Sequence, residues 1–154
     1  MLKFTRNTVI AFDLQEALAF VGETGPYVQY AAVRASKILA KFEERGETLP
    51  DFAAVLTREA LERQLATEEL WQTLLLISKA QTALEEALAK GEPAHFAKYA
   101  FQLAQGFSVF YDGYPVIHEQ DAERRAFLLW MTQYFSKQLA WALGILGIPM
   151  PEYM

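Results

Sequence analysis

Tyrosine and basic residues recur at helical spacing between positions 27 and 41. We call them the tyrosine-basic stripe; they are Tyr27, Tyr30, Arg34, Lys37 and Lys41. An α-helix advances about 100° per residue, so the five side chains fall within an arc of about 80° on one side of a helix. Tyrosine rings stack on unpaired bases, while Arg and Lys meet phosphates. An exposed stripe of this kind suits single-stranded RNA in a loop.

The other side of the same helix is apolar and wide enough to pack on a bundle. Its residues are Val28, Ala31, Ala32, Ala35, Ile38, Leu39 and Phe42. From the residues alone the stripe has a second interpretation, an ordinary helix edge with packed rings and solvated cations. The formal net charge of −5 gives no general attraction to nucleic acid, so RNA binding would depend on this local patch.

The composition indicates one globular domain. The chain has 154 residues, of which 53% are hydrophobic and 21% charged, too apolar for an intrinsically disordered segment. With no Cys there is no disulfide framework and no thiolate metal site. The apolar run Leu139–Met150 is shorter than the roughly 18 residues of a membrane span, and charges interrupt the start of the chain. We expect a soluble cytoplasmic protein that binds neither membrane nor DNA.

Long stretches of helical periodicity between a few Gly and Pro clusters predict an all-α fold, a helical bundle. We expect helices at 13–20, 26–44, 57–64, 67–90, 93–111 and 121–146. A β-prone segment at 2–12 would form an edge or connecting strand. In the helix at 93–111, five residues share a buried arc: Phe96, Tyr99, Leu103, Phe107 and Phe110. Tyr111 lies off that arc beside the turn at Asp112, where its hydroxyl can face water or a ligand.

The sequence gives little support for metal binding or catalysis. Glu92 and His95 form one Glu-x-x-His element, but the second copy of a di-iron site is missing because Pro115 stands three positions before His118. Glycine-rich phosphate loops and the nucleophile elbow are absent from the sequence. We therefore expect no metal, no cofactor and no catalytic residues. A carboxylate enzyme remains the weakest alternative.

Three blocks of sequence resemble one known family. They read Gly-Glu-Thr-Gly-Pro-Tyr-Val-Gln-Tyr-Ala-Ala-Val-Arg at 22–34, Leu-Ala-Gln-Gly-Phe-Ser-Val-Phe-Tyr at 103–111 and Leu-Gly-Ile-Pro-Met-Pro-Glu-Tyr-Met at 146–154. In this order they closely resemble the DALR-type anticodon-binding domain of arginyl-tRNA synthetases, and the resemblance covers essentially the whole chain. The sequence departs from the usual family pattern at Ser108 and Tyr153, where the family has Asn and Arg.

The resemblance implies a helical bundle that docks against a catalytic domain and holds the anticodon arm of tRNA-Arg. The residues it implies near the anticodon bases are Tyr27, Tyr30, Arg34, Tyr111 and Met154. Residues 1–12 would then be a lead-in from an upstream catalytic region, and 13–154 the anticodon-binding domain, with a naturally independent domain as the alternative. We expect the binding set to include Lys37 and Lys41 from the stripe.

The family's catalytic signatures, His-x-Gly-His and a Lys-Met-Ser-Lys-like loop, do not occur in this sequence. The chain alone is therefore expected not to be an enzyme, and the ATP of the arginine–tRNA ligase reaction would bind elsewhere in the parent protein. The main alternative is a helical protein-interaction domain without RNA specificity, which would use the apolar tail Ile145–Met154.

Overall fold

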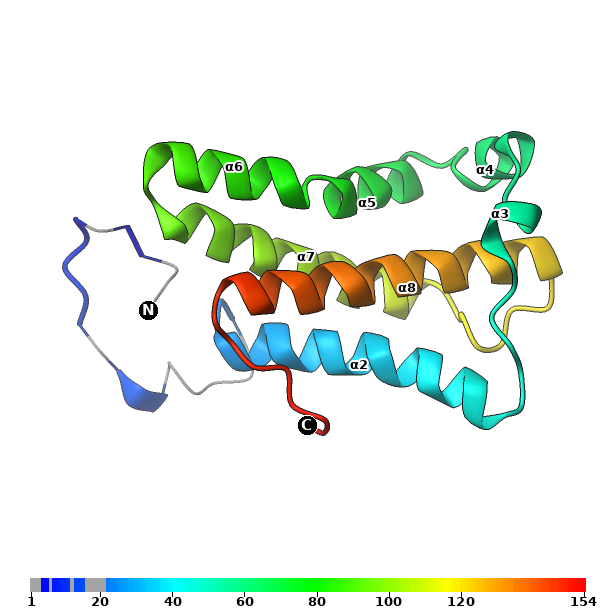
Figure 1. Cartoon of the computed structure of the whole chain (residues 1–154), viewed down its shortest axis with the longest axis horizontal. Coiled ribbons are helices and arrows are strands. Elements are labelled where there is room, and N and C mark those ends of the chain that lie inside the picture. The colour runs from blue at the N-terminus through cyan, green and yellow to red at the C-terminus, as the bar shows by residue number, and fades with distance from the viewer. Residues whose placement is uncertain (1–3, 6, 12, 16–21) are drawn as a thin grey trace.

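The computed structural model describes residues 4–5, 7–11, 13–15 and 22–154, and helices dominate these ranges (Figure 1). From residue 25 onward the helices are α2 (Gly25–Glu44), α3 (Phe52–Val55), α4 (Arg58–Gln64), α5 (Glu68–Ser78), α6 (Ala80–Lys90), α7 (Pro93–Gly113) and α8 (Ala122–Ile145). The long helices α2, α7 and α8 pack on one another, and α5 and α6 cover α7. The predicted all-α bundle is confirmed.

Helix α2 begins where its sequence signals predict. The side chain of Thr24 caps it by accepting a hydrogen bond from the backbone N–H of Tyr27 at 3.4 Å. Pro26 occupies the first turn, where its missing N–H costs nothing. After the helix, Gly46 adopts a φ of 73°, a conformation that glycine tolerates without strain. These signals fix the ends of the helix that carries the tyrosine-basic stripe.

The core lies between α7 and α8 and is rich in phenylalanine. Phe135 of α8 contacts Phe107 and Phe110 of α7, with ring centroids 5.5 and 5.6 Å apart. All five residues of the arc predicted in 93–111 are buried, as are six of the seven on the apolar face of α2, the exception being the partly buried Leu39. The bundle therefore holds α2 by its apolar face and leaves the opposite side outward.

The helix predicted at 67–90 is wrong in one respect, because the chain breaks at Lys79 into α5 and α6. In an unbroken helix the carbonyls of Leu76 and Ile77 would accept from the next turn. Here the single hydroxyl hydrogen of Tyr99 is shared between them, at 3.0 Å to Leu76 O and 3.3 Å to Ile77 O, and Leu76 O also accepts from the backbone N–H of Lys79 at 3.4 Å. A buried side chain from α7 thus compensates for the break, which neither Gly nor Pro signals.

Other boundaries differ by small amounts. Helix α7 continues to Gly113, two residues beyond the predicted end, so Asp112 belongs to its last turn rather than to a connecting turn. The short helix α3 was not predicted; Asp51 caps it by accepting from the backbone N–H of Ala53 at 3.1 Å. Asp121 caps α8 as its position suggested, accepting from the backbone N–H of Arg124 at 2.7 Å.

The strand predicted within residues 2–12 is not formed in the part of that segment that is described. Instead the chain turns, with Thr8 N donating to Thr5 O at 3.0 Å. A strand needs a partner for its backbone groups, and the described residues place none beside it. Leu14 and Gln15 are helical after Asp13, but most of the helix predicted at 13–20 lies outside the described residues.

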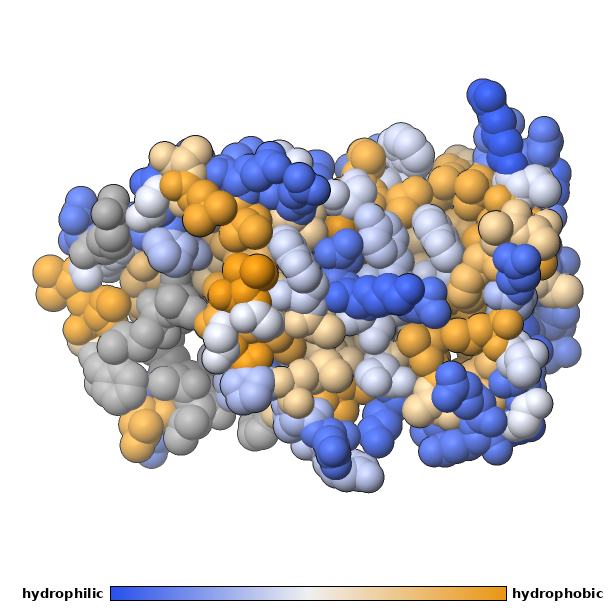
Figure 2. All heavy atoms as spheres, viewed as in Figure 1, coloured by the Kyte–Doolittle hydropathy of each residue, from blue (hydrophilic) through white to orange (hydrophobic). Residues whose placement is uncertain are grey.

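The surface is mostly polar with local apolar areas. Figure 2 shows hydrophobic atoms gathered over the C-terminal ends of α6 and α8, where Leu88 is 70% exposed and Ile145 47% exposed. Among the described residues, the helices are each too short or too polar to cross a membrane.

Candidate RNA interface

The tyrosine-basic stripe lies on the outward side of α2, but its members differ in exposure. Tyr30 is 45% exposed. Lys37 and Lys41 are exposed, whereas Tyr27 and Arg34 are partly buried. The ring of Tyr30 is thus open to solvent, whereas Tyr27, the first tyrosine of the stripe, packs against α7.

Arg34 reaches from α2 to the end of α7. Its guanidinium carbon lies 3.8 Å from the centroid of the Tyr111 ring, a cation–π contact. Its Nη2 lies 3.8 Å from Oδ1 of Asp112, an ion pair too long for a hydrogen bond. The structure therefore brings two predicted site residues from separate helices into direct contact, with an acid beside them.

Tyr27 joins α2 to α7. Its ring centroid is 5.3 Å from that of Phe101, and its hydroxyl is 3.4 Å from Oγ of Ser108. Ser108 donates its single hydroxyl hydrogen to Ala104 O at 3.1 Å, so the Tyr27 hydroxyl is the donor to Ser108. Tyr27 accordingly has a packed ring, in contrast to the open ring of Tyr30.

The C-terminal tail, residues 146–154, turns back from α8 towards α2 (Figure 1). Gln29 donates from Nε2 to Pro149 O at 2.7 Å, and Nζ of Lys37 lies 4.3 Å from the centroid of the Tyr153 ring. Gln29 and Lys37 are separated by about 12 Å of helix. The tail therefore runs along α2 and borders the stripe, with a bend at Glu152.

Tyr153, Gln29 and Asp112 are contacts that sequence reasoning missed. In the sequence Tyr153 stands out only as a departure from the family pattern, and the predicted tail residue is Met154. Met154 is 47% exposed. Among the contacts described, neither Met154 nor Lys41 has a side-chain contact with another predicted site residue. The spacing of tail and helix gives no signal of this pairing, because it depends on how α8 ends.

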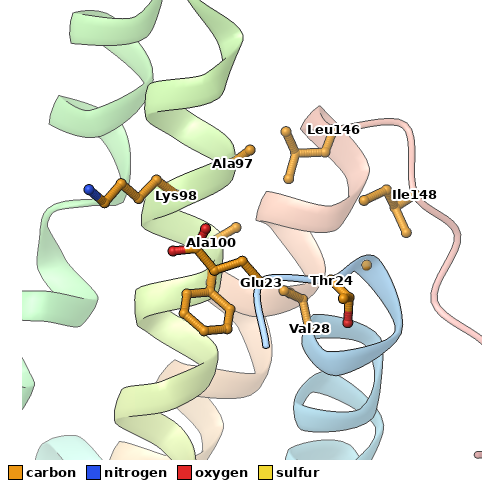
Figure 3. Close-up of a pocket in the computed structure, with 10 residues that line it drawn as sticks. Glu23, Thr24, Val28, Ala97, Lys98, Ala100, Leu146 and Ile148 are labelled. Carbon is orange, nitrogen blue, oxygen red and sulfur yellow. The ribbon is translucent and has the colours of Figure 1, made fainter. Parts of the chain in front are cut away.

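A cavity of about 200 Å³ lies at the start of α2, between α7 and the tail (Figure 3). Its walls include Val28, Phe101, Leu146 and Ile148, with Glu23 and Lys98 as charged members. It shares Phe101 with the packing of Tyr27, but neither Arg34 nor Tyr111 lines it. The cavity is therefore separate from the Arg34–Tyr111 pair.

The shifted carboxylates lie away from the stripe. Arg63 donates to Glu123 at 2.6 Å, and this hydrogen bond lowers the pKa of the Glu123 carboxyl. A hydrogen bond from its own backbone and one from Thr57 lower the pKa of Glu59. A general acid at neutral pH needs a raised pKa. These two groups are therefore suited to helix capping and ion pairing, which gives no support to a carboxylate enzyme.

Comparison with known proteins assigns the fold to a family. Residues 28–154 match the DALR anticodon binding domain family. The arginine–tRNA ligase of Clostridium perfringens is 34% identical over 154 residues, 99% of this chain and 26% of that protein. That of Hyphomonas neptunium is 37% identical over 151 residues, 97% of this chain and 24% of that protein.

A solved structure shows the same arrangement of helices. The arginyl-tRNA synthetase of Thermus thermophilus superposes with a TM-score of 0.73 at 31% identity, over 93% of this chain and 23% of that one. The chain spans about a quarter of the length of the curated relatives it matches. With the family match covering most of the sequence, the chain belongs to the DALR anticodon-binding domain family.

Proposed function

We propose that this chain binds the anticodon arm of tRNA-Arg, as the RNA-binding domain of an arginine–tRNA ligase. The observation that carries the proposal is the Arg34 guanidinium stacked on Tyr111 beside the open ring of Tyr30. Family membership and the similarity to arginine–tRNA ligases support this choice of RNA. The protein would act in the cytoplasm, where its partner tRNA is charged.

The proposed role of each residue in RNA binding follows from the chemistry of its side chain. Tyr30 offers a ring on which an unpaired base can stack, and Arg34 offers N–H donors in a plane fixed by Tyr111. Lys37 and Lys41 extend the basic character along α2 and would meet phosphates of the loop. Tyr153, with its ring beside Lys37, would close the edge of the surface.

The parent activity, ligation of arginine to tRNA-Arg with ATP, belongs in this proposal to a catalytic domain that lies outside this sequence. Acceptor-arm contacts made there would raise the effective concentration of the anticodon arm at this surface. The isolated chain is therefore expected to bind tRNA more weakly than the whole ligase. The expectation of no cofactor remains part of the proposal for this chain.

Chemical-shift mapping tests the proposed surface. A stem-loop with the anticodon loop of tRNA-Arg is added to isotope-labelled protein, and the same stem with an unrelated loop is the control. The expected result is that shifts concentrate at Tyr30, Arg34, Lys37 and Tyr111 with the cognate loop and are weaker with the control. Shifts confined to other faces, or equal for the two loops, would reject the proposal.

A second candidate is protein docking through the apolar area at the ends of α6 and α8. Leu88, in the last turns of α6, is 70% exposed, and Ile145, the last residue of α8, is 47% exposed. The partner we propose is the catalytic domain of the same ligase. Hydrogen exchange on full-length ligase would show protection of these helix ends if they form the domain interface, and exchange equal to that of the isolated chain would reject it.

A further inference from the structure

Asp112 places a negative charge inside the proposed RNA interface. Its Oδ1 is 3.8 Å from Nη2 of Arg34, and the two side chains are 71% and 33% exposed. At this distance the carboxylate offsets the charge of Arg34 without taking a hydrogen bond from it. Among the described residues the N–H groups of Arg34 have no hydrogen-bond acceptor. The guanidinium is thus held over Tyr111 with its donors unused.

The stability of α7 gives no reason for an acid at this position. Asp112 lies in the last turn of the helix, where the macrodipole favours cations and disfavours anions. Exposed ion pairs contribute little to folding, and this one is long. The Asp112 carboxylate therefore lies at the helix end that disfavours an anion, and it acts mainly on groups that bind to Arg34.

Asp112 would affect the two kinds of hydrogen-bond acceptor in RNA, phosphates and base edges, in different ways. A phosphate drawn to Arg34 would come within a few ångströms of the carboxylate, well inside the Debye length of about 10 Å at 0.1 M salt. A carbonyl or ring nitrogen on a base edge carries no net charge and avoids this repulsion. Specificity commonly uses a repulsive element against the wrong partner as well as attraction for the right one.

We infer that Asp112 is a specificity-determining residue: it prevents Arg34 from neutralising a phosphate of arbitrary RNA and reserves its N–H groups for a neutral acceptor on a base edge. The inference rests on the proposed function and deepens it, because it assigns Arg34 to base reading. Asp112 acts through Arg34 and is a positioning residue in this account.

The test compares wild type with Asp112→Asn, using the cognate anticodon stem-loop and the same stem with an unrelated loop, across a range of salt concentrations. For the unrelated loop, the variant is expected to bind roughly three- to tenfold more tightly at low salt. Its slope of log affinity against log salt is expected to steepen by about 0.7 to 0.9, the value for one added phosphate contact. Affinity for the cognate loop rises less, so discrimination falls.

Two further variants separate this role from a general change of charge. Glu62→Gln removes the same charge from an acid that is 65% exposed and paired with Arg58 at 3.0 Å on α4, away from the interface. It is expected to keep the wild-type slope and discrimination. Asp112→Glu retains the charge and is expected to keep the wild-type slope and the wild-type discrimination between the two loops. In an Arg34→Ala background, Asp112→Asn is expected to have no effect on either quantity.

If Asp112 stabilised the fold, Asp112→Asn would have a lower melting temperature than wild type. The melting temperature is instead expected to stay equal or rise slightly, because the anion leaves the helix end. If wild type discriminates between the loops but Asp112→Asn behaves like Glu62→Gln, the inference is wrong while the proposed function stands. If wild type shows no preference between the loops, the proposed function fails, and this inference fails with it.

Discussion

The ammonium group of Lys37 lies 4.3 Å from the centroid of the Tyr153 ring, which joins the middle of α2 to the penultimate residue of the chain. Together with the hydrogen bond from Gln29 to Pro149 at 2.7 Å, this contact holds the tail along the tyrosine-basic stripe. The tail has few other anchors in the part of the chain described beyond Ile148. Its position therefore depends on two side chains of α2.

Replacing Gln29 with alanine is expected to release the tail. The Pro149 carbonyl loses its side-chain donor, and Tyr153 is then held only by an exposed cation–π contact of about 0.5–1 kcal/mol. Carboxypeptidase should remove Met154 and Tyr153 several-fold faster than in wild type. Gln102→Ala, a change at an exposed position of α7, is the control. Equal digestion of the two variants would show that Gln29 does not anchor the tail.

The ring of Tyr111, rather than its hydroxyl, is expected to matter for RNA binding. Tyr111→Phe keeps the surface on which Arg34 lies, whereas Tyr111→Leu removes a contact of about 0.5–2 kcal/mol. Affinity for tRNA-Arg should fall roughly two- to thirtyfold in Tyr111→Leu and stay within about twofold in Tyr111→Phe. A titration followed by fluorescence anisotropy measures both. Equal losses would assign the role to the hydroxyl instead.

Phe135 is expected to be the most sensitive test of the core. It is fully buried and contacts both Phe107 and Phe110. Phe135→Ala should lower the free energy of unfolding by about 3–5 kcal/mol, through lost burial and the cavity left behind. Val109→Ala, at a side chain 63% exposed on α7, should change it by less than about 0.5 kcal/mol. Urea unfolding of both variants measures the contrast, and a loss under 1 kcal/mol at Phe135 would contradict this packing.

Burial raises the pKa of the Tyr99 hydroxyl well above its ordinary value, with Tyr134 as a lesser cause. Since the folded pKa exceeds the unfolded one, the stability this group contributes is fully present below about pH 10 and is lost as pH rises above that value. Tyr99→Phe should cost about 1–3 kcal/mol at pH 7, because the hydroxyl hydrogen shared between the carbonyls of Leu76 and Ile77 is lost.

The difference in unfolding free energy between wild type and Tyr99→Phe should shrink as pH rises from 7 towards about 11. Urea unfolding at several pH values measures it. A constant difference over this range would mean that Tyr99 titrates in the folded protein as it does in the unfolded chain.

The helices and their buried faces were largely predictable, because they depend on local signals. Pro26 and Asp121 stand at the predicted helix starts, and the 3.6-residue period predicts the buried side chains of α7 correctly. The break at Lys79 was not predictable in this way. It depends on Tyr99, some twenty residues away, whose hydroxyl bonds the carbonyls that the break exposes.

The stripe on α2 was also predictable, but its partners were not. The sequence predicts Tyr111 as a site residue, but its stacking with Arg34 depends on how α7 packs beside α2. The pairing of Lys37 with Tyr153 joins positions more than a hundred residues apart. Sequence spacing fixes which side chains share one helix face, whereas contacts between elements depend on packing.

The most direct test of the central claim is a titration at low salt of tRNA-Arg and of an unrelated tRNA against wild type, Tyr30→Ala and Arg34→Ala. Trp71→Ala is a matched control, since Trp71 is 44% exposed on α5 and Tyr30 is 45% exposed on α2. The account predicts tighter binding of tRNA-Arg by wild type and by Trp71→Ala. For Tyr30→Ala it predicts a loss of about 1–3 kcal/mol, the value of one stacked base. Equal affinity for the two tRNAs, unchanged by Tyr30→Ala and Arg34→Ala, would contradict it.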